Sequence, residues 1–160
     1  MLLRPNEGAA LIAAVEAGYL RRDAWQAWAE RRMLADGAIP PWLHALSTSR
    51  DVDEALAALW EGLHESERAS TDALTAEIDG TSLRLGFLFL RHQRGEIDVA
   101  ALLSAAGELT DRANYDRPTC EAFFMLLNEA DAGRAPTERV EALFAEHAEA
   151  ARRWLAVLDA

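Results

Sequence analysis

Glu61 and His64 form the only Glu-x-x-His pair in the chain, a spacing that can bind a metal ion. Residues three apart share one face of a helix, so the pair would present a carboxylate beside an imidazole. Carboxylate-bridged di-iron bundles need a second such pair on a facing helix, and no other histidine here has a glutamate three residues before it. We therefore expect neither a metal nor a cofactor, and a small metal-dependent enzyme is the third-ranked alternative.

Two other side chains could carry chemistry. His147 lies among apolar residues at helical spacing, where a buried imidazole can act as a base or a pH switch. No Ser, Cys or carboxylate is placed by sequence to complete a site, so a core-edge histidine with one hydrogen-bonded nitrogen is expected. Cys120 shares a predicted helix face with Phe123 and Phe124, which favours a core cysteine. We expect no catalytic residue and a non-enzymatic protein.

The negative charge of the chain is concentrated. Residues 51–80 hold nine acids and one Arg, so they carry −8 of the net charge of −11. A concentrated negative field indicates which binding partners the protein can have. It disfavours nucleic acid and anionic membranes, and it favours a basic protein, such as a toxin domain. The acids expected at this interface are Asp51, Asp53, Glu54, Glu61, Glu65 and Glu67. Trp42, which follows two prolines, is expected to be the most exposed tryptophan and an aromatic anchor.

A simpler interpretation stays open, in which the acids only keep the protein soluble. The chain would then be a helical adaptor or regulatory subunit, and its binding would not depend on the acidic face. The two interpretations differ in the salt dependence that they predict for association with a partner.

Length and composition favour one domain. A chain of 160 residues that is 51% hydrophobic can build its own core, so we expect a single all-helical domain over residues 1–160. The single cysteine excludes an internal disulfide and indicates a reducing compartment, hence a cytoplasmic protein. Polar residues from Arg4 to Glu7 interrupt the apolar N-terminus, which argues against a signal peptide. The oligomeric state is not predicted.

Helical spacing recurs along the chain and predicts a bundle of seven or eight mostly antiparallel helices. Asp51, Asp98, Asp116 and Thr137 are expected to cap the starts of four of them. Residues 66–82 are expected to form a loop with a helical turn around Asp72–Glu77.

One segment fits two structures. Apolar residues alternate over 83–89, a strand signal, and Asp79-Gly80 could turn a β-hairpin near residues 77–90. A basic turn and Gly95 then follow, which is typical of the end of a helix. We predict a helix and keep the hairpin as the alternative.

Several segments resemble small helical bacterial proteins of the toxin-immunity type. In the first half these are Ala17-Gly18-Tyr19-Leu20-Arg21-Arg22, Trp25–Ala29 and Pro40–Leu46, and in the second half Gly95–Leu109 and Asn114-Tyr115-Asp116-Arg117-Pro118. The resemblance implies a protein that binds and neutralises a cognate toxin, with acidity that complements a basic nuclease. It assigns no binding residue.

Overall fold

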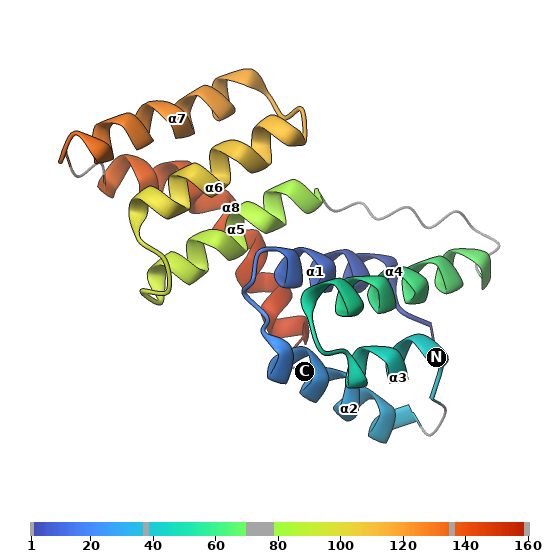
Figure 1. The fold of residues 1–160 in the computed structure, drawn as a ribbon. Helices are drawn as coiled ribbons and strands as arrows, with labels where there is room; N and C mark the ends of the chain where they lie inside the picture. Colours follow the sequence, from blue (N-terminus) through green and yellow to red (C-terminus); the bar gives the residue numbers. More distant parts are fainter. Residues whose placement is uncertain (1, 37–38, 70–78, 135–136, 159–160) are drawn as a thin grey trace. The chain divides into compact units, whose positions relative to one another are not determined.

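In the computed structural model, the residues that can be described are 2–36, 39–69, 79–134 and 137–158. They contain eight α-helices and no strand, which confirms the predicted all-helical bundle (Figure 1). The helices are α1 (Pro5–Glu16), α2 (Arg22–Asp36), α3 (Pro41–Thr48), α4 (Val52–Ala69), α5 (Gly80–Gln93), α6 (Val99–Arg112), α7 (Arg117–Asp131) and α8 (Thr137–Leu158). None of them combines the length and apolar character that crossing a membrane requires.

The chain divides into two compact units. The first comprises Met1–Gly80 with Arg153–Ala160, and the second comprises Thr81–Arg152. The expectation of a single domain over residues 1–160 stays a prediction.

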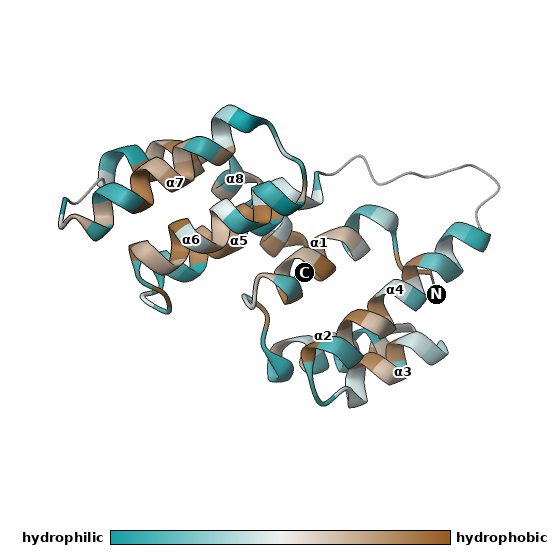
Figure 2. Ribbon diagram, turned by 45° about the horizontal axis from the view of Figure 1, so that its top comes forward, coloured by the Kyte–Doolittle hydropathy of each residue, from teal (hydrophilic) through white to brown (hydrophobic). Residues whose placement is uncertain are grey.

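The first unit is built on contacts of α1 with α4, α2 with α3, and α3 with α4. Helix α4 is amphipathic and shows hydrophobic and hydrophilic sides in Figure 2, whereas α1 is buried on nearly all sides. Each helix places large side chains in one core, which also includes Leu158 from the last turn of α8. Trp25 and Trp28 belong to this core, and the indole Nε1 of Trp25 donates a hydrogen bond to Ser49 Oγ at 2.8 Å. This bond ties α2 to the end of α3.

The second unit contains α5, α6, α7 and most of α8. Helices α6 and α7 lie side by side and antiparallel, joined by a short connection (Figure 1). Phe144 of α8 stacks on Phe89 of α5 and packs at a tilt on Phe123 of α7, with 5.1 Å between ring centroids in both pairs. These aromatic contacts join three helices in one core.

The apolar segment for which the sequence allowed either a helix or a β-hairpin is helical and belongs to α5. α5 begins at Gly80, which confirms the predicted helix, and the β-hairpin alternative for residues 77–90 is wrong. Its side chains from Leu83 to Leu90 are almost all buried, and burial on every side explains an apolar run without a polar face.

The predicted loop over residues 66–82 is wrong at both of its described ends. α4 continues to Ala69, because Ser66 extends its buried face and Arg68 suits the negative end of a helix. α5 already includes residues 80–82. The turn predicted around Asp72–Glu77 lies outside the described residues.

Three of the four predicted caps are confirmed at atomic level, and two of these lie in the second unit. Asp98 accepts a hydrogen bond from the main-chain N–H of Ala101 at 2.8 Å, and Asp116 accepts one from Thr119 at 3.0 Å. Each bond satisfies a donor that the first turn of the helix leaves free. Thr137 is the first residue of α8.

Candidate functional site

Helix α4 buries one face and exposes the opposite one. Its buried residues follow the i, i+3, i+4, i+7 spacing of a single helix face. They are Ala55, Ala58, Leu59, Gly62, Leu63 and Ser66. The other face is in contact with solvent, and we call it the outer face of α4. It consists of Asp53, Ala57, Trp60, Glu61, His64 and Glu67, all exposed.

Trp60 lies at the centre of the outer face. It is 45% exposed, which is unusual for so large an apolar side chain. Asp53 and Glu67 are seven residues before and after it, on the same side of the helix and about 10 Å away along the axis. His64 lies one turn after Trp60, with 6.2 Å between the ring centroids. The outer face is therefore an aromatic centre between two carboxylates.

The acids of α4 differ in whether a base is beside them. Glu61 accepts a hydrogen bond from Arg68 Nη2 at 2.9 Å, and both side chains are exposed. Within the part of the chain that the structure describes, Asp53, Glu65 and Glu67 have no ion-pair partner. Glu65 is half-buried, whereas Asp53 and Glu67 are exposed. The uncompensated charge at the surface thus lies on each side of Trp60.

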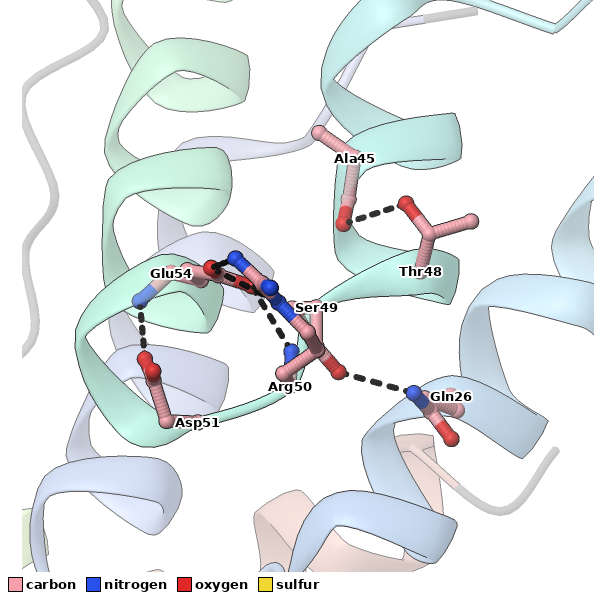
Figure 3. Close-up of polar contacts among 7 residues, drawn as sticks. All are labelled: Gln26, Ala45, Thr48, Ser49, Arg50, Asp51 and Glu54. Atoms are coloured by element: carbon pink, nitrogen blue, oxygen red, sulfur yellow. Dashed lines mark hydrogen bonds and ion pairs between the residues drawn. The ribbon is translucent and has the colours of Figure 1, made fainter.

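The start of α4 is a closed polar network (Figure 3). Asp51 Oδ1 accepts from the main-chain N–H of Glu54 at 2.9 Å, which confirms the predicted cap. Glu54 accepts from both the guanidinium and the main-chain N–H of Arg50. These hydrogen bonds lower the pKa of Glu54 below its usual value. The bond from the Arg50 side chain makes the largest contribution, and the bond from the Arg50 main chain makes the second largest. Glu54 is already paired with a base, so it contributes less than expected to the negative surface.

Trp42 is not exposed, and the sequence-based expectation for it is wrong. Its side chain is 1% exposed and is one of the largest in the core. It packs against α4 at Gly62, where an added Cβ would lie 2.6 Å from Trp42 Cδ2. The missing side chain at Gly62 makes room for the indole ring, so Trp42 fills the space between α3 and α4. It cannot be a surface anchor in this conformation.

A groove of about 470 Å³ lies between α3 and α4. Ala45, Ala57 and Ala58 form part of its wall, and Glu54 and Glu61 also line it. Small side chains on both helices leave this space open. Because Ala57 and Glu61 belong to the outer face as well, the groove borders that face.

The other candidate residues occupy ordinary structural positions. Among the described residues, no three or more His, Cys, Asp or Glu side chains are placed to hold a metal ion. Cys120 is half-buried, with its Sγ 3.8 Å from the carbonyl oxygen of Gly107. His147 is half-buried, and its Nδ1 lies 2.7 Å from Ser82 Oγ. Sequence reasoning missed this serine, because the contact joins α5 to α8 across 65 positions of the chain.

Sequence reasoning also missed the exposure of Trp60. Val52, Leu56 and Trp60 recur at helical spacing with other apolar residues, so this pattern predicts Trp60 on the buried face, whereas the structure exposes it. The helical period does carry a signal for this exposure. Positions 53, 60 and 67 recur every seven residues and therefore share one helix face, and two of the three are acidic.

Comparison of the chain with protein-family models, with curated protein sequences and with solved structures gives no match.

Proposed function

We propose that this protein is a non-enzymatic binding module whose outer face of α4 docks on a basic surface of a protein partner. The observation that carries the proposal is the exposed Trp60 between two carboxylates, Asp53 and Glu67, that have no ion-pair partner among the described residues. Protein interfaces concentrate their binding energy in a few aromatic anchors surrounded by a polar rim. The outer face has both features on one rigid helix.

Charge and anchor would perform different parts of the binding. Asp53 and Glu67 would attract a basic partner over distances of about 10 Å at moderate salt and so speed association. Trp60 would then bury its ring in an apolar pocket of the partner and slow dissociation. The neighbouring groove would admit one partner side chain.

The partner class that we propose is a basic toxin domain, which makes the protein an inhibitor of the immunity type. Two considerations support this choice: the resemblance of the chain segments to such proteins, and the charge complementarity that a basic nuclease would offer. The protein encoded by the neighbouring reading frame is the first probe to purify.

The experiment measures the association and dissociation rates of the full chain with that probe between 25 and 300 mM NaCl. Over this range the screening of interactions between charged groups changes strongly. D53R/E67R is the test variant, because neither acid has a structural partner among the described residues. D111R/E146R is the matched control, since it changes the net charge equally at two exposed acids of the second unit.

We expect D53R/E67R to slow association at low salt by about tenfold or more and to weaken its salt dependence. The control should change the rate much less, and Trp60→Ala should mainly speed dissociation. Equal effects of the two double variants would mean that only overall charge matters. Association independent of salt would favour an adaptor without an electrostatic role for the acids.

A further inference from the structure

The second unit contains a cavity of about 630 Å³. It lies where the end of α5 meets the first turns of α6 and α8. Pockets for small molecules have volumes of roughly 300–1,000 Å³. This cavity is therefore large enough for a compact organic molecule, and its lining indicates which kind.

One part of the lining is apolar. Phe89 of α5 and Val140 of α8 are buried, and Val99 at the start of α6 is half-buried. These side chains offer no hydrogen bonds, so they favour a ligand with an alkyl or aryl group. Phe89 is held in place by its stacking on Phe144, which gives the wall a defined shape.

His92 supplies a hydrogen-bond acceptor in the same cavity. Its Nδ1 lies 3.0 Å from the carbonyl oxygen of Ile97. A carbonyl oxygen can only accept, so Nδ1 must carry the proton of this hydrogen bond. In the neutral ring, Nε2 then has a lone pair and accepts from a ligand donor. The chain fold selects this tautomer before any ligand binds.

The remaining polar groups make the cavity negative. Asp98 and Glu141 both line it, and none of the described lining residues is an Arg. Within the described residues, neither carboxylate has an ion-pair partner. The helix ends contribute about half a charge each: positive at the starts of α6 and α8, negative at the end of α5. These contributions only partly offset two full carboxylate charges. One guanidinium lies beside the cavity, because Arg152 donates to Oε1 of the lining residue Gln93 at 2.8 Å, and its single charge offsets only one of the two carboxylates.

We propose that this cavity binds a small organic cation, an amine or guanidine that carries an apolar group. Its N–H groups would donate to Asp98, Glu141 and His92 Nε2, and its apolar group would contact Phe89 and Val140. An organic cation fits better than a metal ion, because no three described His, Cys, Asp or Glu residues are close enough to coordinate one. None of the lining residues belongs to α4, so a test of this cavity does not depend on whether the proposed docking face is correct.

The test compares three probes of one shape and different charge on the full chain. Phenethylamine is the cation, phenethyl alcohol the neutral analogue and 3-phenylpropionate the anion. Calorimetry gives the affinities, and the imidazole ¹⁵N signals of His92 report on its hydrogen bonds. We expect saturable binding of phenethylamine, a shift of the His92 Nε2 signal, and an affinity at least about tenfold above those of the analogues.

Variants locate the site. D98N/E141Q removes both charges and keeps the start of α6, because Asn caps helices as well as Asp does. It should lower the affinity for phenethylamine about tenfold or more, whereas the control E138Q/E146Q, on α8 outside the lining, should not. Val99→Phe should block binding by filling the cavity.

Equal affinities for the three probes would overturn the proposal, since charge would then play no part. So would the absence of saturable binding, or undiminished binding to D98N/E141Q.

Discussion

A Cβ atom added to Gly86 of α5 would overlap the main-chain carbonyl oxygen of His147 in α8. It would also lie 2.8 Å from the Cβ of Ala151. Glycine and alanine thus allow the two helix backbones to approach closely within the second unit. A backbone carbonyl inside a helix cannot turn aside as a flexible side chain does, so this contact depends on the absence of a side chain at position 86.

Gly86→Ala should therefore destabilise the protein, although alanine favours helix formation by about 1 kcal/mol over glycine. The overlap should cost more than that, with a net loss of about 1–3 kcal/mol in the free energy of unfolding. Urea unfolding measures it. Gly107→Ala is the control: its new Cβ would meet the ring of Phe124, which is 39% exposed and can move. A larger loss for the control would contradict this explanation.

Truncation of the two tryptophans of the α3–α4 region should lower the free energy of unfolding by very different amounts. Trp42→Ala removes a fully buried ring and should lower the free energy of unfolding by about 3–5 kcal/mol. Trp60→Ala removes a ring that is 45% exposed and should cost less than about 1 kcal/mol. Chemical denaturation of both variants measures the two losses in the free energy of unfolding. Similar losses would show that Trp60 has a structural role and would weaken its assignment as an anchor.

Glu7 of α1 is 1% exposed and holds two arginines. Its Oε2 accepts from Arg4 Nε and from Arg32 Nη2, each at 3.2 Å. The guanidinium of Arg32 also lies 5.4 Å from the centroid of the Trp28 ring. Arg32→Ala should cost about 2–4 kcal/mol, because the buried carboxylate loses its half-buried partner. Arg4→Ala should cost about 1 kcal/mol or less, since that side chain is 68% exposed. Thermal or urea unfolding that ranks the two in the opposite order would be inconsistent with this network.

The Arg50–Glu54 pair should add a pH dependence to stability. The pKa of Glu54 is lowered in the folded state by the Arg50 side chain and main chain, relative to an ordinary value of 4.5. The folded state therefore holds the ionised form more strongly, and this stabilisation is present above pH 4.5. It is lost as the pH falls through the lower pKa of the folded protein.

Glu54→Gln removes the titrating group and tests this sign. The wild type should be more stable than the variant at pH 7, and the difference should shrink on acidification below about pH 4.5. Urea unfolding across this range gives the difference directly. A difference that stays constant from pH 7 to pH 2 would show that the pair contributes nothing through ionisation.

Much of the helical architecture could be predicted from the amino-acid sequence. Apolar spacing located the helices, and Asp98 and Asp116 marked two starts, because capping depends on residues three apart. Gly95, with a φ of +71°, marked the end of α5 in the same local way. The accumulation of acids over residues 51–80 is likewise a property of the sequence alone.

Which side chains reach the surface was decided by tertiary packing. Trp42 is buried only because Gly62, twenty positions later, leaves room for its ring, and Trp60 is exposed because the opposite face of α4 packs on α1 and α3. The pairing of Ser82 with His147 and the cavity beside His92 also join residues far apart in the chain. Local patterns encode hydrogen bonds within one turn of a helix, whereas these contacts depend on how whole helices pack against each other.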